Sequence, residues 1–217
     1  MNPDATAIIS LLATAVGALS GALFAVERRF GLSGVLALAF AAGCSGSLMR
    51  DVLLQGVGPS VVLTEVRVLL TVVACAAVGF FFATAIRLVH RLLVLLDALS
   101  IGFFAALGTA KAIDVGLDLP GAVLIGSINA VGGWVLRDLL SGERPQLVLP
   151  GPIYAIAAGL ASALYAALVI FGQVSDEWAA LATIIVGFAI RMAALRYSWT
   201  APAPVDLTPR GRRPGRD

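Results

Sequence analysis

Seven charged residues lie inside or at the edges of long apolar runs, where they can line an ion path, gate it or form buried ion pairs. They are Arg50, Asp51, Asp97, Lys111, Arg137, Asp138 and Arg191. A charge at the centre of a membrane span costs about 2.5–3.5 kcal/mol on insertion scales, so each needs water or an oppositely charged partner. Adjacent helical residues point about 100° apart, so Arg50 and Asp51 are not expected to neutralise each other. We expect Asp138 to pair with Arg191, and Arg50 with a carboxylate on the outer side.

Each of these charges also has a purely structural interpretation. Arg50 and Arg137 can extend to an interface, and Asp97 is better explained as a first-turn carboxylate near Arg91 and the helix dipole. Lys111 would oppose cation flow, so on a path it would gate rather than select. A charge that moves through the membrane field is worth about 2.3 kcal/mol per 100 mV. The alternative for Lys111 is an interfacial anchor.

Glycines near the middle of two apolar runs indicate a second kind of chemistry. Gly43, Ser45 and Gly46 lie in one run, and Gly132 and Gly133 lie in the other. Glycine costs about 1 kcal/mol relative to alanine inside a helix, so a helix break is one explanation for these residues. A break frees carbonyls, which with the Ser45 hydroxyl are ligands for a potassium-like cation near Ser45 and Gly133. Close packing of small residues without a pore is the alternative.

The composition excludes several other classes of protein. Of 217 residues, 59% are hydrophobic and 13% are charged, and the mean hydropathy is +0.97; soluble domains are about 45–50% apolar and 25% charged. This excludes a soluble enzyme, a nucleic-acid-binding protein and a disordered scaffold, and no soluble partner is evident. Cys44, Cys75 and the single His90 form no ligand cluster. We therefore expect no metal and no cofactor, only a permeating cation.

Seven apolar runs are long enough to cross a bilayer, because about 20 helical residues span the hydrocarbon. They cover 7–26, 32–55, 61–86, 92–110, 120–140, 153–171 and 178–195. Unbroken runs of this length indicate helices, since barrel strands alternate every second residue. The sequence therefore predicts an all-α integral membrane protein with seven transmembrane helices in one bundle.

Basic residues mark one face of this predicted bundle. They are Arg28 and Arg29 after the first run, Arg87 and Arg91 after the third, Arg144 after the fifth and Arg196 after the seventh. The positive-inside rule places this face in the cytoplasm, with the N-terminus outside and the C-terminus inside. Residues 199–217 are rich in proline and arginine and are predicted to be a disordered cytoplasmic tail. The expected location is the cell (inner) membrane, as a multi-pass protein.

The sequence repeats itself at an offset of 87 residues. Without a gap, Gly21 matches Gly108, Gly46 matches Gly133, Arg50 matches Arg137 and Asp51 matches Asp138. Because the offset spans three helices, an odd number, the second copy enters the membrane from the opposite side, as in many transport proteins. We expect a first three-helix repeat over 1–89, an inverted second repeat over 90–174 and a seventh helix over 175–198.

A doubled glycine-x-x-x-Arg-Asp motif carries a resemblance to a known family. With Leu96-Asp-Ala-Leu99, Gly108-Thr-Ala-Lys-Ala112, Tyr154 and Arg191, it resembles prokaryotic trimeric intracellular cation channels over about residues 10–195. The resemblance implies two inverted three-helix repeats plus a seventh helix. It also implies a homotrimer in the lipid bilayer with one pore per subunit. The implied activity is passive conduction of monovalent cations, mainly potassium, with sodium a second candidate.

The resemblance also implies which residues lie on the pore. The two broken helices correspond to Gly43, Ser45 and Gly46 and to Gly132 and Gly133, and Lys111 and Asp138 match polar positions of the path. This sequence has Ser45 before Gly46 where the family usually has two glycines, so the first break is expected to be less pronounced. The lysine-glutamate-valine signature of the animal branch is absent, so the lipid binding of that branch is not carried over.

These residues favour a potassium-permeable channel without covalent chemistry. A secondary transporter of a small solute such as an amino acid (glycine) is the alternative, because inverted repeats with broken helices serve transporters equally well. A structural membrane protein is the third class, and it requires every intramembrane charge to be merely packed. Unitary currents distinguish a channel from a transporter, which shows saturable, substrate-specific flux.

Overall fold

The computed structural model describes residues 2–55, 58–82, 89–148 and 154–199. Its elements are α1 (Pro3–Glu27), α2 (Leu32–Leu53), α3 (Val61–Thr64), α4 (Val66–Phe82), α5 (Val89–Asp114), α6 (Leu119–Leu140), the 3-10 turn η2 (Gln146–Val148), α7 (Tyr154–Ile170) and α8 (Asp176–Arg196). The tail predicted for 199–217 lies outside the described residues from residue 200 onward, as do 83–86 at the end of the third apolar run and Arg87.

Most of the predicted spans coincide with a helix, and the third is divided. The described part of this run, 61–82, forms α3 and α4, separated at Glu65, whose backbone is extended (φ −102°, ψ 103°). Ser60 begins α3, and its hydroxyl oxygen accepts a hydrogen bond from the Val62 amide at 3.4 Å. The fourth run is longer than predicted, because α5 begins at Val89. Asp97 therefore lies in the third turn of α5 and not in its first.

Capping side chains determine where several helices begin. The Asn2 carboxamide oxygen accepts a hydrogen bond from the Asp4 amide at 3.2 Å, at the start of α1. The Asp118 carboxylate accepts one from the Gly121 amide at 3.1 Å, with Pro120 in the first turn of α6. Such caps satisfy amides that have no partner inside the helix.

Four of the described helices, α1, α5, α6 and α8, end in the same left-handed turn, and α1 and α5 illustrate it. Arg29 after α1 has φ 61°, and Gly116 after α5 has φ 84°. The next amide in each case donates to a carbonyl five residues back, Phe30 to Ala25 and Leu117 to Ala112, both at 3.0 Å. This arrangement satisfies carbonyls at the end of a helix. It turns the chain sharply before the next helix begins.

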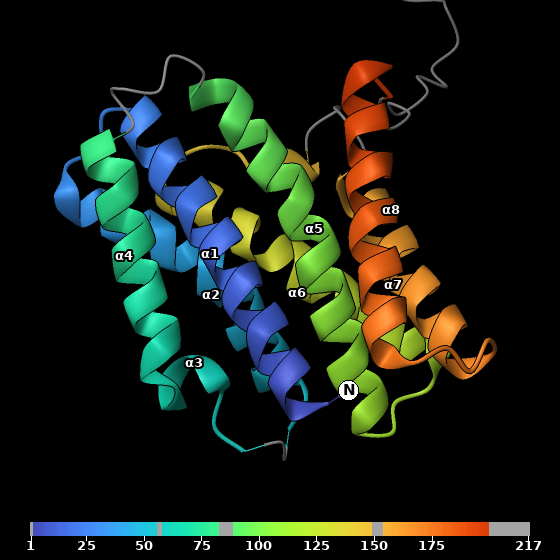
Figure 1. Cartoon of the computed structure of the whole chain (residues 1–217). Helices are drawn as coiled ribbons and strands as arrows, with labels where there is room; N and C mark the ends of the chain where they lie inside the picture. The colour runs from blue at the N-terminus through green and yellow to red at the C-terminus, as the bar shows by residue number, and fades with distance from the viewer. Residues whose placement is uncertain (1, 56–57, 83–88, 149–153, 200–217) are drawn as a thin grey trace, which may run out of the picture.

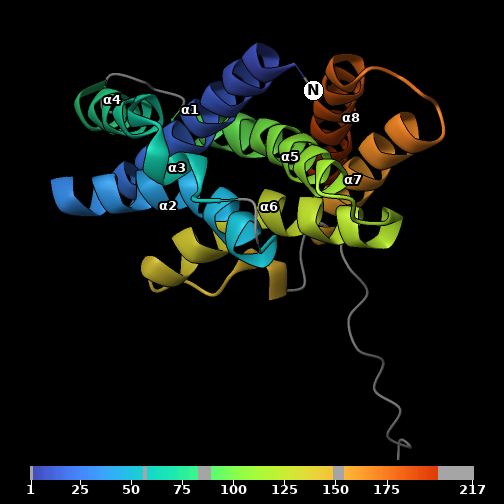
Figure 2. The ribbon, with the colours of Figure 1, turned by 90° about the horizontal axis from the view of Figure 1, so that it is seen from below.

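Four helices form the centre of the molecule: α1 contacts α2 and α5, and α6 also contacts α2 and α5. Figure 1 shows α4 on one side of this group, and α7 and α8 on the other. The view from below in Figure 2 shows α2 and α6 side by side, beneath α1 and α5 in the picture. The four central helices are thus covered by α4 on the flank of α1 and α2, and by α7 and α8 on the flank of α5.

The long helices run up and down between two ends of the molecule. In Figure 1, α1 rises from the N-terminus and α5 descends beside it. The ends of α1 and α6 meet, because Arg28 Nη2 donates to Glu143 Oε2 at 3.0 Å. His90, at the start of α5, lies 3.1 Å from Glu27. We call the end of the molecule that contains Arg28 and His90 the basic end. At the opposite end, the Asn2 amide donates a hydrogen bond to Glu177 at 3.2 Å.

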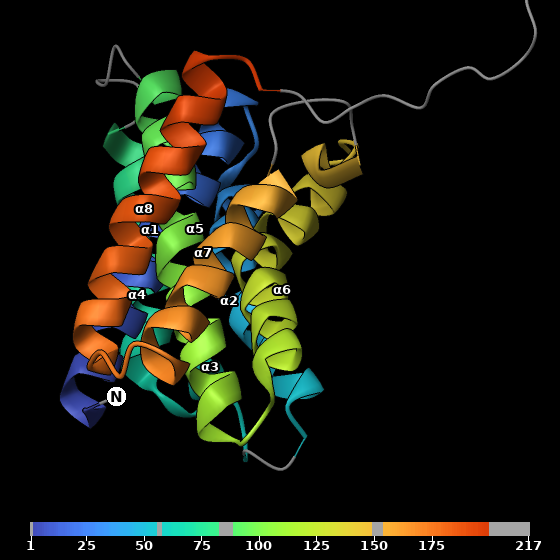
Figure 3. The same cartoon turned by 90° about the vertical axis from the view of Figure 1, so that its right-hand side faces the viewer.

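Five of the described helices are long and apolar enough to cross a membrane, namely α1, α2, α5, α6 and α8. The shorter apolar helices α4 and α7 have 17 residues each. Large apolar side chains point outward along the bundle, for example Leu70 and Phe81 of α4 and Leu160 of α7. An outward apolar surface of this kind fits lipid or a second subunit. The side view in Figure 3 shows the helices roughly aligned along one direction.

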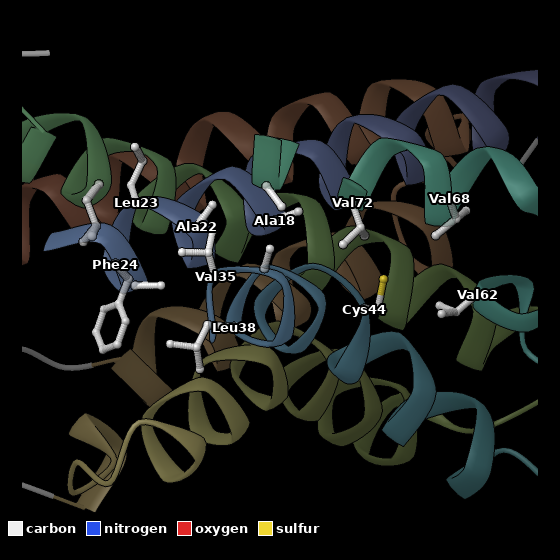
Figure 4. Close-up of a cluster of buried hydrophobic side chains, with 14 residues drawn as sticks. Ala18, Ala22, Leu23, Phe24, Val35, Leu38, Cys44, Val62, Val68 and Val72 are labelled. Carbon is white, nitrogen blue, oxygen red and sulfur yellow. The ribbon is translucent and has the colours of Figure 1, made fainter. Parts of the chain in front are cut away.

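Small side chains let the helices approach closely. In the cluster of Figure 4, Ala18 and Ala22 of α1 pack with Val35 and Leu38 of α2, and Val72 of α4 covers the same group. Alanine and glycine bring helix backbones together where lipid supplies no hydrophobic driving force between helices. Glycines bring the backbones of α2 and α6 together in the same way.

Replacing Gly133 with alanine tests how close this approach is. A methyl group there would lie 2.6 Å from the carbonyl oxygen of Ala42 on α2, so a backbone has to shift. We expect Gly133→Ala to destabilise the protein by about 1–3 kcal/mol, measured as a lower thermal unfolding midpoint in detergent.

Gly159→Ala is the matched control, because it is also a glycine inside a helix. A methyl group at Gly159 meets only the Ser127 hydroxyl, at 3.8 Å, so the gain in helix propensity should leave stability unchanged or raised. Equal unfolding midpoints for the two variants would contradict the close contact of α2 and α6.

Candidate functional site

The backbones of α2 and α6 touch at the glycines that the sequence singles out. A methyl group on Gly46 would collide with the carbonyl oxygen of Asn129, and one on Gly132 would lie 3.2 Å from the Gly46 Cα. Gly43 faces α1 instead, where a methyl group would lie 3.0 Å from Ala18. These glycines therefore bring three helices into backbone contact.

The predicted helix breaks are absent. Both α2 and α6 are continuous through their glycines, and the Ser45 hydroxyl donates to the Ala41 carbonyl in its own helix. The prediction of freed carbonyls at Gly43, Gly46 and Gly133 is wrong for this conformation. The physical reason is that glycine permits close packing as readily as a break, and here the neighbouring helix takes up the space.

Asp51 is the centre of the first buried charge cluster. Its carboxylate accepts hydrogen bonds from Lys111 Nζ at 2.8 Å, Arg50 Nε at 2.8 Å and the Ser60 hydroxyl at 2.6 Å. Asp51 and Arg50 are buried, whereas the Lys111 side chain is 26% exposed. We call these four residues the Asp51 cluster; it contains two cations and one carboxylate.

Arg137 is the centre of the second cluster. Its Nη1 donates to both Asp97 oxygens at 3.1 and 3.2 Å, and its Nη2 donates to Asp138 at 3.1 Å. The Ser20 hydroxyl also donates to Asp97, and the guanidinium lies 4.1 Å from the centre of the Phe24 ring. We call Ser20, Asp97, Arg137 and Asp138 the Arg137 cluster; it contains one cation and two carboxylates.

The prediction that Arg50 and Asp51 do not neutralise each other is wrong, whereas the predicted partner on another helix is confirmed for Asp51. Arg50 and Arg137 each bond the aspartate that follows them, because a long arginine side chain can fold back across the 100° between neighbouring positions. Both aspartates were expected to need partners elsewhere, and Asp51 has one in Lys111 of another helix. Arg137 likewise has a partner on another helix, Asp97.

Asp138 does not pair with Arg191. The second oxygen of Asp138 accepts the Gln146 amide at 3.2 Å, while the Arg191 guanidinium lies 3.5 Å from the centre of the Tyr154 ring. The interpretation of Asp97 as a helix-dipole carboxylate near Arg91 is also wrong. Asp97 is 5% exposed and bound to Arg137.

The two clusters lie near opposite ends of the central helices. Asp97 and Lys111 are fourteen residues apart on α5, which corresponds to about 21 Å along a helix axis. The hydrocarbon of a bilayer is about 30 Å thick, so both clusters fit within or at the edges of it. Asn129 lies between them on α6, and its amide donates to the Phe104 carbonyl.

A cavity of about 160 Å³ opens beside the Arg137 cluster at the basic end. Asp97, Arg137, Tyr154 and Arg191 line its inner part, and Arg28 also contributes to its wall. Sequence reasoning missed this cavity, because its walls come from five helices far apart in the chain. Among the described residues, no group of three or more His, Cys, Asp or Glu is arranged to hold a metal.

Several residues of the clusters were not predicted. Ser20, Ser60 and Phe24 contact buried charges, yet serine and phenylalanine are ordinary in an apolar run. Their positions in the sequence contain no signal, since only the packing of helices shows which serine meets a carboxylate.

Comparison with known proteins places the chain among membrane proteins. A family model described as "Glycine transporter" matches residues 7–84 and 94–169. The inner membrane protein YadS of Escherichia coli K12 is 31% identical over 202 residues, which cover 89% of this chain and 93% of YadS. A UPF0126 membrane protein of Deinococcus radiodurans is 34% identical over 151 residues, covering 69% of this chain and 70% of the relative.

Solved structures extend this likeness to the fold. A trimeric intracellular cation channel orthologue from Rhodobacter sphaeroides superposes with a TM-score of 0.81 at 31% identity, over 88% of this chain and 97% of that one. A second structure, described as the basis for conductance through such cation channels, gives 0.79 at 26% identity over 96% and 100%. The chain is therefore a multi-pass integral membrane protein that belongs to the UPF0126 proteins, the prokaryotic members of the trimeric intracellular cation (TRIC) channel family.

Proposed function

We propose that this protein is a monovalent cation channel that conducts potassium passively, with sodium as a second permeating ion. The likeness to solved TRIC cation channels, which covers 88–96% of the chain at TM-scores near 0.8, carries the proposal. The neighbours are channels and not enzymes, which fits a site without covalent chemistry.

The proposed path runs between α1, α2, α5 and α6, from the Asp51 cluster to the Arg137 cluster. Because Gly46 and Gly133 bring α2 and α6 into backbone contact, ions pass when these helices separate. The proposed path then passes Ser45 of α2 and Gly133 of α6, where the two helices have separated. Asp97 and Asp138 place two carboxylates beside Arg137 at that end of the proposed path.

Two inverted three-helix repeats and a seventh helix form the proposed architecture. The matched segments 7–84 and 94–169 begin 87 residues apart, the offset of the sequence repeat. In Figure 1, α1 and α5 run in opposite directions, as the first helices of inverted repeats must.

Helix contacts support the same symmetry. A methyl group on Gly46 meets the Asn129 carbonyl, and one on Gly133 meets the Ala42 carbonyl. The repeat offset of 87 residues relates these two contacts, because it matches Gly46 with Gly133 and Ala42 with Asn129. A two-fold axis between Gly46 and Gly133 explains both contacts at once.

We propose a homotrimer with one pore in each subunit. The exposed apolar side chains of α4 and α7, such as Phe81 and Leu160, supply surface for neighbouring subunits and lipid. The four central helices form a complete path in a single chain, so no pore between subunits is needed. The N-terminus is placed outside, with the basic end in the cytoplasm.

Recording the purified protein in a planar bilayer under a potassium chloride gradient tests conduction. We expect discrete currents that reverse near the potassium equilibrium potential, because a channel passes many ions at each opening. Silence together with saturable glycine uptake into liposomes would contradict the channel and favour the secondary transporter.

Lys111→Gln tests a gate at the Asp51 cluster. The change removes the 2.8 Å ion pair between α5 and α2, so we expect an altered open probability and a changed voltage dependence, with the reversal potential unchanged. Single-channel recording at several voltages measures both quantities.

Arg67→Gln is the matched control, since Arg67 carries the same charge at the same end but its side chain is 75% exposed. It should leave the open probability unchanged. A shifted reversal potential with normal gating in Lys111→Gln would remove Lys111 from the gate.

Cysteine labelling tests the inverted topology and the orientation. In a variant without Cys44 and Cys75, Arg29→Cys lies after α1 and Val115→Cys lies after α5, both exposed. We expect an impermeant maleimide added outside intact cells to label only Val115→Cys. Labelling of both positions from the same side would contradict the inverted repeat, and labelling of Arg29→Cys alone would reverse the orientation.

A further inference from the structure

Helix α8 carries large aromatic side chains at both of its ends. Trp178 lies in the first turn and is 68% exposed; Tyr197 follows the last turn and is 69% exposed, and Trp199 is 46% exposed. Tryptophan and tyrosine combine an apolar ring with an N–H or O–H group, so they favour the boundary between lipid headgroups and hydrocarbon. The three rings are therefore placed as candidates for contact with this boundary.

A left-handed turn brings the last two of these rings together. Ser198 has φ 51°, and the Trp199 amide donates to the Ala194 carbonyl at 2.9 Å. The chain turns back at this point, and the Trp199 ring stacks with the Tyr197 ring, with the ring centres 6.2 Å apart and the planes inclined by 24°. The two rings form one aromatic group at the end of α8.

The spacing of the rings along α8 matches the thickness of a bilayer. Trp178 and Tyr197 are nineteen residues apart, which corresponds to about 28 Å along a helix axis, and the hydrocarbon of a bilayer is about 30 Å thick. The charges of α8 agree with these limits. Asp176 and Glu177 come just before Trp178, and Arg196 comes just before Tyr197.

The outer side of α8 is apolar between the two aromatic ends. Leu181, Ile185 and Val186 are exposed along it. Within 178–195 the one charged residue is Arg191, which is 3% exposed. The helix packs against α5 and α7 and forms an edge of the bundle in Figure 1. Its charge-free outer side complements hydrocarbon and continues the lipid-facing surface that an integral membrane protein must have.

We propose that the bilayer anchors α8 at both ends, with the Trp178 ring in one headgroup boundary and the Tyr197 and Trp199 rings in the other. The occupant of this side of α8 is lipid and not another subunit. Arg191 lies six residues before Tyr197, about 9 Å inside the hydrocarbon boundary. A guanidinium facing lipid at this depth is costly, so the anchored helix holds it inside the protein against the Tyr154 ring, 3.5 Å away.

Fluorescence quenching in lipid bilayers measures the depth of each ring without any recording of current, so its failure is distinguishable from failure of conduction. The chain has three tryptophans. Trp134→Phe with Trp199→Phe leaves Trp178 as the emitter, and Trp134→Phe with Trp178→Phe leaves Trp199. We expect each to be quenched more strongly by lipids brominated near the headgroup end of the acyl chain than by lipids brominated near its terminus.

Trp134 is the matched control, because it is 5% exposed inside the protein. With Trp178→Phe and Trp199→Phe, its emission should be quenched weakly by both lipids. If Trp134→Phe does not fold, comparing the wild type with Trp178→Phe and with Trp199→Phe gives the two depths by difference.

Two kinds of result would overturn the proposal. Stronger quenching of Trp178 or Trp199 by the deep bromines would place that ring within the hydrocarbon. Protection of either ring from both lipids would also overturn it: quenching by aqueous iodide would then place the ring in water, and protection from iodide as well would place it at a contact between subunits.

Thermal unfolding in bilayers of increasing acyl-chain length tests the anchoring itself. The unfolding midpoint of the wild type should be highest where the hydrocarbon is about 30 Å thick. Trp178→Ala removes one anchor, so we expect a flatter dependence on chain length. Phe171→Ala changes an aromatic side chain that is 72% exposed just before α8 but has no N–H group, and it should keep the dependence of the wild type. An unchanged dependence in Trp178→Ala would overturn the proposal.

Discussion

The contact between the backbones of α2 and α6 at Gly46 and Gly133 determines the arrangement of the charges. Each glycine is followed four residues later by an arginine and five residues later by an aspartate, about 6 and 8 Å further along its helix. Because the two helices run in opposite directions past the contact, the two Arg-Asp pairs diverge from it toward opposite ends. One motif, used twice, thus supplies both clusters.

Helix α5 completes both clusters with charges of opposite sign. Lys111 approaches the carboxylate of Asp51, and Asp97 approaches the guanidinium of Arg137. Removing one partner of a buried ion pair typically costs about 3–5 kcal/mol. Any motion that separates α5 from α2 or α6 must therefore supply new partners or water, which is why we propose these contacts as control points of the proposed path.

Residue types and their order in the sequence were sufficient for some parts of the site. The cost of polar groups in hydrocarbon predicts that the charges require partners, that the glycines require an explanation, and that Asp51 and Arg137 need a partner on another helix. The pairing of Asp138 with Arg191 and the helix breaks were wrong. Side-chain rotamers and the distance between helices decide such details, and neither is encoded at a single position.

The sequence by itself determined the membrane class, the approximate spans and the doubled motif, because apolar length, charge placement and internal similarity are linear properties of a chain. Only the tertiary structure decided that Gly46 and Gly133 touch the facing helix, that α5 pairs with both motifs and that Arg191 stacks on Tyr154 beside a cavity. These contacts join residues that are up to about a hundred positions apart, and their geometry depends on how closely small side chains let the helices pack.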